Sequence, residues 1–163
     1  MTIILHLRGV GGQALPLIVS MLGRRAADAG ATLTSREVFG MAQRGGSVFA
    51  TLDIALNGDD GPASDSSPSI LLGFELLEGI RGFTALRPGQ HAFVSTARIV
   101  PPGSWDADAT PYPSVEAAAA IAAQFGITLH LVEASAGAPW KVVQAAIDAQ
   151  TLPLGARAGV RVS

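Results

Sequence analysis

The sequence contains no cysteine, few charged residues and no surplus of basic residues. Each of these absences limits the functions that the protein can have. Without Cys, the 163-residue chain cannot form a disulfide, hold zinc or an iron–sulfur cluster through thiolates, or use a cysteine nucleophile. Its 11 basic and 13 acidic residues give a net charge of −2, so it lacks the positive surplus of a sequence-independent nucleic-acid binder. Only 15% of residues are charged and 48% are hydrophobic, which predicts that a partner covers part of the surface.

Long apolar segments are also missing. No stretch of 18 or more apolar residues occurs, so we expect no membrane span. The first residues, Met1–Arg8, lack the basic region of a signal peptide and are typical of a strand, so we expect a cytoplasmic protein. The length fits one compact domain that spans residues 1–163.

Segments typical of strands and helices alternate along the chain. Apolar runs bounded by turns at Ile3–Leu7, Ser69–Phe74 and Ile127–Val132 predict strands buried on both faces of a sheet with parallel βαβ units. Hydrophobic patterning, turn residues and caps predict three further strands and four helices. These strands are expected at Ala31–Phe39, Ser47–Leu56 and His91–Thr96, and the helices at Ala14–Ala29, Glu75–Arg81, Val115–Phe125 and Trp140–Ala149.

The first candidate site is the glycine-rich turn Gly9-Val10-Gly11-Gly12-Gln13, which lies between a strand and a helix. Such a turn and the helix N-terminus after it offer N–H groups to an anion. Gly9, Gly11 and Ala14 fit the loose dinucleotide-binding pattern, with Glu37 at the distance of a ribose ligand. The alternative is a tight turn that holds no ligand, and the pattern alone does not decide between the two.

The second candidate site is the segment from Glu37 to Ser47. Gly40, Gly45 and Gly46 bracket one amide, Gln43, and one guanidinium, Arg44. The planar fork of Arg suits a carboxylate or a phosphate. We therefore expect a ligand or partner contact here, and the alternative is a solvated loop.

The remaining polar residues form no catalytic or metal-binding set. His6, His91 and His130 are far apart in the sequence without metal-ligand spacing, so we interpret them as structural. Glu75 and Glu78 lie three residues apart, and we interpret them as solvated residues or helix-dipole partners. We assign no catalytic residue and no metal ligand, which favours a binding or partner subunit.

Longer blocks of sequence resemble a known family. They are Gly9–Gln13, the block Gly40-Met41-Ala42-Gln43-Arg44-Gly45-Gly46-Ser47-Val48, Leu71-Leu72-Gly73-Phe74-Glu75 with Glu78, and Tyr112-Pro113-Ser114. They look like the gamma-type domain of 2-oxoacid:ferredoxin oxidoreductases, and most like the beta subunit of the indolepyruvate enzymes. The resemblance runs from about residue 3 to about residue 135, and the tail from about residue 138 matches poorly.

The resemblance implies a Rossmann-like three-layer α/β/α sandwich with a mostly parallel sheet. It implies a subunit of a hetero-oligomer that decarboxylates an aryl-2-oxoacid such as indolepyruvate, transfers the acyl group to coenzyme A and reduces ferredoxin. Thiamine diphosphate and the iron–sulfur clusters would belong to the large partner subunit, so this chain alone would hold no cofactor and be inactive. By position, the residues for a ligand or partner contact would be Gly9, Gly11, Gly12, Gln13, Gln43, Arg44, Gly45 and Gly46.

Two positions depart from the family pattern. Ala14 stands where the family commonly has Gly, and Phe39 stands where it commonly has His. A Cβ at residue 14 restricts the backbone and crowds a ligand, and the loss of the His removes a titratable group. These departures leave open a 2-oxoacid substrate other than indolepyruvate. The alternative to the oxidoreductase subunit is a stand-alone dinucleotide-binding module, based on the pattern Gly9, Gly11 and Ala14 with Glu37.

Overall fold

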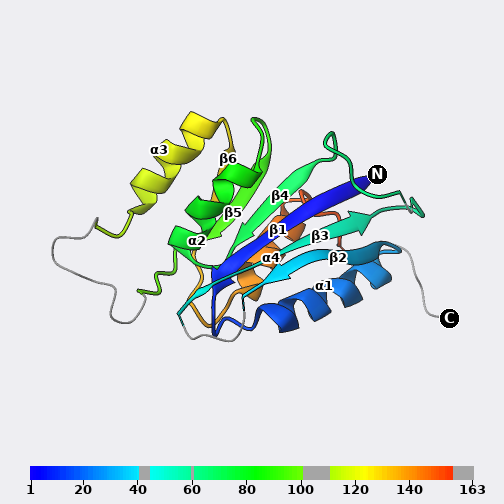
Figure 1. Ribbon diagram of the computed structural model, residues 1–163, viewed down its shortest axis with the longest axis horizontal. Helices are drawn as coiled ribbons and strands as arrows, with labels where there is room; N and C mark the ends of the chain where they lie inside the picture. The colour runs from blue at the N-terminus through cyan, green and yellow to red at the C-terminus, as the bar shows by residue number, and fades with distance from the viewer. Residues whose placement is uncertain (41–44, 60, 101–110, 156–163) are drawn as a thin grey trace.

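The computed structural model describes residues 1–40, 45–59, 61–100 and 111–155 (Figure 1). They form one α/β unit around a six-stranded sheet with the order β2-β3-β1-β4-β5-β6. The strands are β1 (Thr2–Val10), β2 (Thr32–Phe39), β3 (Ser47–Ala55), β4 (Ser69–Gly73), β5 (His91–Ser95) and β6 (Thr128–Val132). The helices are α1 (Leu15–Asp28), α2 (Leu76–Arg81), the 3-10 turn η1 (Gly82–Ala85), α3 (Val115–Phe125) and α4 (Trp140–Asp148).

Strand direction divides the sheet into two parts. β1, β4, β5 and β6 pair in parallel, as the βαβ pattern predicts. β3 runs antiparallel to both of its neighbours, β1 and β2. The prediction of a mostly parallel α/β sheet is confirmed. That prediction did not include an antiparallel strand, and β3 is one.

Helices pack against both faces of the sheet and enclose two hydrophobic clusters. On one face, α1 and α4 cover side chains such as Leu5, Leu52 and Leu72. On the other face, α2, η1 and α3 cover side chains such as Leu71 and Ala92. Adjacent residues of β4 thus point into different cores, which gives the α/β/α layering that the resemblance implied.

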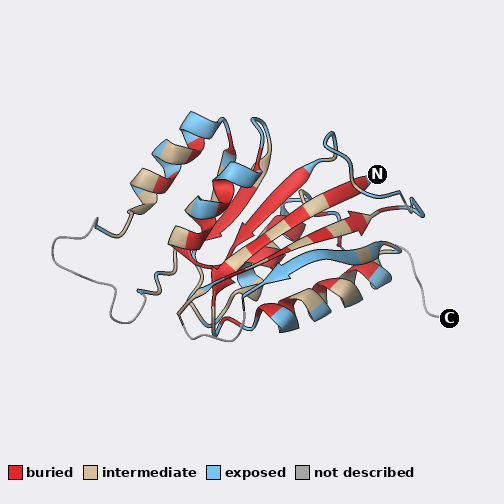
Figure 2. Cartoon of the chain, in the orientation of Figure 1, coloured by how far each residue is buried: buried red, intermediate tan, exposed pale blue. Residues whose placement is uncertain are grey.

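The expectation that three strands are buried on both faces is correct for one of them. Every residue of β4 is buried, whereas β1 alternates over most of its length and β6 is largely half-buried or exposed. The physical reason is position: β6 is an edge strand, and on the second face α2 and η1 contact only part of β1, while among the described residues no helix lies over most of β3 and β2 (Figure 2). In the described part of the chain, no helix has both the length and the apolar character that crossing a membrane requires.

Candidate functional site

The glycine-rich turn lies where the chain changes sides of the sheet. β1 leads into α1 on one face, and its parallel neighbour β4 leads into α2 on the opposite face. The carboxyl ends of two such strands form the crevice in which open α/β sheets bind ligands. The structure therefore brings the turn after β1 to the edge where the fold class places functional sites.

Two of the predicted loops meet at this edge. The N–H of Gly11 donates to the carbonyl oxygen of Gly46 at 2.7 Å, and the N–H of Gly45 donates to the carbonyl oxygen of Gly11 at 3.3 Å. The contact follows from the antiparallel register, since Val10 at the end of β1 lies opposite Ser47 at the start of β3. Gly9, Gly11, Gly12, Gly45 and Gly46 are thus brought together. The predicted site residues Gln43 and Arg44 lie outside the described residues.

Gln13 fills the crevice with its own side chain. It is buried, and its Oε1 accepts a hydrogen bond from the N–H of Val10 at 2.9 Å. Its Nε2 donates to the carbonyl oxygens of Phe74 at 2.8 Å and Ala136 at 3.1 Å. One amide therefore ties together the turns that follow β1, β4 and β6. Among the predicted site residues that the structure describes, Gln13 is the one whose side chain bonds within the fold itself.

The turn uses most of its N–H groups internally. Those of Val10, Gly11 and Gln13 donate to the Gln13 side chain, to Gly46 and to the Val10 carbonyl oxygen. The first turn of α1 contains Pro16, which has no N–H, and the N–H groups of Leu17 and Ile18 both donate to Ala14. An anion cradle needs free N–H groups that converge. This arrangement offers little to a pyrophosphate.

Glu37 lies away from the turn. In the dinucleotide-binding fold the acidic residue ends the strand next to β1, whereas here β3 separates β2 from β1. Glu37 lies opposite Thr51 of β3, which in turn lies opposite His6 of β1, three residues before Gly9. The geometry therefore does not favour a stand-alone dinucleotide-binding module.

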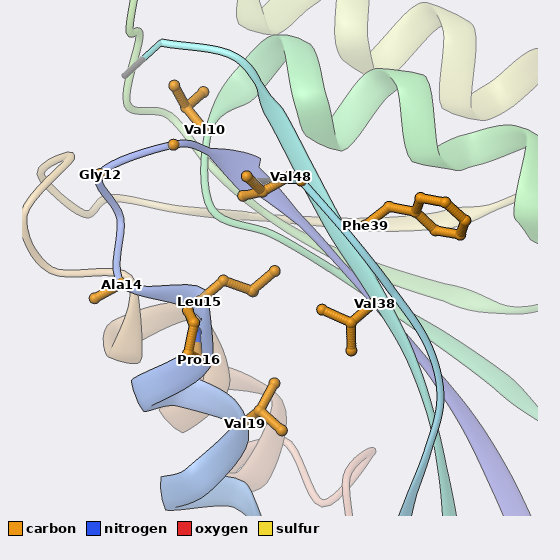
Figure 3. A pocket seen from close by; sticks show the side chains of 11 residues that line it. Val10, Gly12, Ala14, Leu15, Pro16, Val19, Val38, Phe39 and Val48 are labelled. Carbon is orange, nitrogen blue, oxygen red and sulfur yellow. The ribbon is translucent and has the colours of Figure 1, made fainter. Parts of the chain in front are cut away.

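An apolar cleft opens beside the turn, between the start of α1, the end of β2 and the start of β3 (Figure 3). Its volume is about 540 Å³. Val38 reaches into it from β2 and is 58% exposed, while Leu15 and Val19 reach toward it from α1. The sequence analysis missed the cleft. The signal for it was the apolar pair Val38-Phe39 at the end of a strand whose other residues are largely polar.

A buried carboxylate cluster lies on the opposite face of the sheet. Glu78 is 3% exposed, and its Oε1 accepts from Arg81 Nη1 at 2.7 Å and from Ser47 Oγ at 2.6 Å. Its Oε2 accepts from Arg8 Nη2 at 3.3 Å. The side chain of Arg8 also lies over the ring of Phe49. The interpretation of Glu78 as a solvated residue is wrong, because β1 brings the guanidinium of Arg8 to it, the start of β3 brings the hydroxyl of Ser47, and α2 itself supplies Arg81. Its place in the first turn of α2 fits the helix-dipole alternative.

Glu75 caps α2, as the helix-dipole interpretation implied, and it too is buried. Its Oε2 accepts from the N–H of Glu78 at 2.9 Å, and its Oε1 accepts from the N–H of Ile99 at 3.3 Å. Burial raises the pKa of the Glu75 carboxyl, although these N–H groups and that of Leu77 act in the opposite direction. Its contacts are those of a structural cap, so the interpretation as a solvated residue is wrong here as well.

Two of the histidines are neighbours in space. His91 Nδ1 and His130 Nε2 lie 3.0 Å apart, and the ring of His130 stacks on Phe93. The two nitrogens share one hydrogen bond across β5 and β6, which suits a structural pair. Burial, and secondarily the charge of His91, lower the pKa of His130. Within the described ranges, no three His, Cys, Asp or Glu residues are grouped so as to hold a metal ion.

Comparison with known proteins adds to this geometry. The family model of pyruvate ferredoxin/flavodoxin oxidoreductase matches residues 4–159. The indolepyruvate oxidoreductase subunit IorB of Pyrococcus horikoshii is 35% identical over 111 residues, which are 66% of this chain and 53% of that protein. IorB of Thermococcus kodakarensis is 32% identical over 108 residues, with the same two shares. The chain therefore spans about half the length of the curated relatives that it matches.

A solved structure is also similar. It is the gamma subunit of a keto/oxoacid ferredoxin oxidoreductase from Geobacter sulfurreducens, with 22% identity and a TM-score of 0.41. The match covers 59% of this chain and 51% of that one.

Proposed function

The chain belongs to the pyruvate ferredoxin/flavodoxin oxidoreductase family, and we propose that it is the non-thiamine subunit of a 2-oxoacid:ferredoxin oxidoreductase. The substrate class is an aryl-2-oxoacid such as indolepyruvate. One observation carries the proposal, namely the alignment with IorB over two thirds of this chain. The absence of cysteine supports the assignment of the iron–sulfur clusters to a partner subunit, because this sequence offers them no thiolate ligand.

The proposed reaction is oxidative decarboxylation. The 2-oxoacid anion and coenzyme A give an acyl-CoA, carbon dioxide, one proton and two electrons, and ferredoxin accepts the electrons. Thiamine diphosphate would be held by the partner subunit, together with the iron–sulfur clusters, for which this chain has no thiolate ligands. With ferredoxin as the acceptor, the complex would act in the cytoplasm.

This chain would contribute contacts and no reacting group. The paired glycine loops, with Gly9, Gly11 and Gly12 on one side and Gly45 and Gly46 on the other, present closely approaching backbone to a partner or ligand. Gln43 and Arg44 are proposed as contacts from the same block of sequence. Gln13 would act as a positioning residue, since its amide holds the turn in shape.

The proposal is tested by affinity purification of the tagged full chain from its native cell. We expect a large subunit to co-purify with thiamine diphosphate and iron, and the complex to reduce ferredoxin when indolepyruvate and coenzyme A are both present. The chain expressed alone, as the matched control, should show no turnover. Purification as a lone chain or homodimer, or full turnover by the isolated chain, would contradict the proposal.

A further inference from the structure

We propose that the apolar cleft between α1 and β2 is a binding site for a planar, uncharged aromatic ring. In the complex this ring would be the aryl group of the 2-oxoacid, and that second statement rests on the function proposed above. The first statement depends only on the cleft and can be tested on this chain by itself.

The walls of the cleft are apolar on every described side. Leu15, Pro16 and Val19 of α1 form one wall, and Val38 and Val48 of β2 and β3 form the facing wall. The turn between them adds Val10 and the bare backbone of Gly11 and Gly12. A flat ring placed between these two facing walls would contact apolar side chains on both of its sides.

The chemistry of the lining selects a neutral occupant. None of the described side chains that line the cleft carries a charge. The N–H groups of Val10, Gly11 and Gln13 are already bonded within the loops, so these three groups are not available to an anionic group in the cleft. Binding would therefore come from the removal of apolar surface from water, above all that of the exposed Val38.

The surroundings favour a small ligand over a protein surface. The cleft volume of about 540 Å³ lies in the usual range for small-molecule pockets. The nearby exposed apolar side chains do not extend it into a flat patch. Leu17 lines a separate hollow beside Trp140, and the ring of Phe39 points away from the cleft and stacks on Phe49. A protein partner would need a broad contact of about 800 Å².

The first experiment uses indole as the probe and the full chain as the receptor. Binding is measured by ligand-observed NMR for the wild type, for Val38→Trp, which fills the slot, and for Leu131→Trp as the control. Leu131 matches Val38 because it is an exposed apolar residue on the opposite edge strand. We expect indole to bind the wild type and the control alike, and Val38→Trp to weaken binding at least tenfold. No binding to the wild type, or equal binding to both variants, overturns the proposal.

The second experiment uses the assembled complex. We expect Val38→Trp to lower kcat/KM for indolepyruvate at least tenfold relative to pyruvate, with the subunits still co-purifying, and Leu131→Trp to leave that ratio unchanged. Loss of the partner subunit from Val38→Trp would show that a protein side chain fills the cleft and would overturn the proposal. If no complex or 2-oxoacid activity exists, the proposed function fails, and indole binding to the full chain still decides whether the cleft is a ring site.

Discussion

The side-chain amide of Gln13 donates to the main-chain oxygen of Phe74 across 61 residues of sequence, at 2.8 Å. The same amide bonds Val10 and Ala136, so the turns after three parallel strands share one buried side chain. Gln13 therefore stabilises the edge of the sheet at which the two glycine loops meet.

Gln13→Leu should lower the free energy of unfolding by about 2–3 kcal/mol. The substitution leaves the N–H of Val10 and the carbonyl oxygens of Phe74 and Ala136 without the amide, and each buried polar group left unpaired costs about 1–3 kcal/mol before relaxation. Denaturation in urea measures the change. Gln144→Leu is the control, because its amide bonds only the exposed Asp148 one turn along α4, and it should change stability by less than about 0.5 kcal/mol. Equal losses in the two variants would refute this role for Gln13.

The substitutions Gly79→Ala and Gly23→Ala, both within helices, should change the stability of the protein in opposite directions. A Cβ at Gly79 would lie 2.3 Å from Cγ1 of the buried Val94, so α2 would have to move away from β5. A Cβ at Gly23 in α1 meets nothing within 4 Å. We expect Gly79→Ala to destabilise the protein by about 1–3 kcal/mol through overpacking, and Gly23→Ala to stabilise it by about 0.5–1 kcal/mol through helix propensity. Thermal unfolding of both variants checks the signs, and a neutral Gly79→Ala would show that α2 is not held by this contact.

Most of the elements could be predicted because local chemistry fixes their ends. Ser114 caps α3 through its hydroxyl, which accepts from the N–H of Ala117, and Gly126 ends the same helix with φ of 68°. Pro16 stands in the first turn of α1, where a missing N–H is tolerated. These signals lie within a few residues of the boundaries that they set, so a single sequence is enough to locate them.

The antiparallel direction of β3 could have been predicted from the length of the connection between β2 and β3. Seven residues, 40–46, separate β2 from β3, and parallel neighbours need a crossover of about a dozen residues or more. The short connection therefore requires an antiparallel pair. The engagement of Gln13 with Ala136 could not have been predicted in the same way, because it depends on where a turn 123 residues away lies in space.

Ala14 has a left-handed backbone, with φ of 56° and ψ of 44°. A residue with a Cβ pays roughly 1 kcal/mol for this conformation. Ala14→Gly should therefore stabilise the protein by about 0.5–1 kcal/mol. Ala29→Gly is the control, because Ala29 ends the same helix with an ordinary right-handed backbone, and its replacement should destabilise slightly. Chemical denaturation of the pair checks the prediction, and a loss of stability in Ala14→Gly would contradict it.

Glu78 should matter more than either arginine that it bonds. Glu78→Gln removes the charge that Arg8 and Arg81 share at a site that is almost fully buried. We expect a loss of about 2 kcal/mol, the usual size for hydrogen bonds to charged groups. Arg81→Ala should cost less than about 0.5 kcal/mol, because that side chain is half exposed and water screens its charge. A loss in Arg81→Ala as large as in Glu78→Gln would show that the ion pair, and not the buried carboxylate, holds α2 against the sheet.

Because of the pair formed by His91 and His130, the stability of the protein should decrease as the pH is lowered. The pKa of His130 is lowered in the folded protein, so the unfolded chain binds the proton more readily. The stability is present above pH 6.5, the ordinary value, and decreases as the pH falls from there toward the lowered pKa. Between pH 7.5 and pH 5.5, the melting temperature of His130→Gln should fall less than that of the wild type. His6, whose pKa burial and two arginines also lower, and Glu75, whose pKa burial raises, titrate in both proteins, so the difference between them reports on the pair formed by His91 and His130. Identical pH profiles would show that the shared proton contributes nothing to stability.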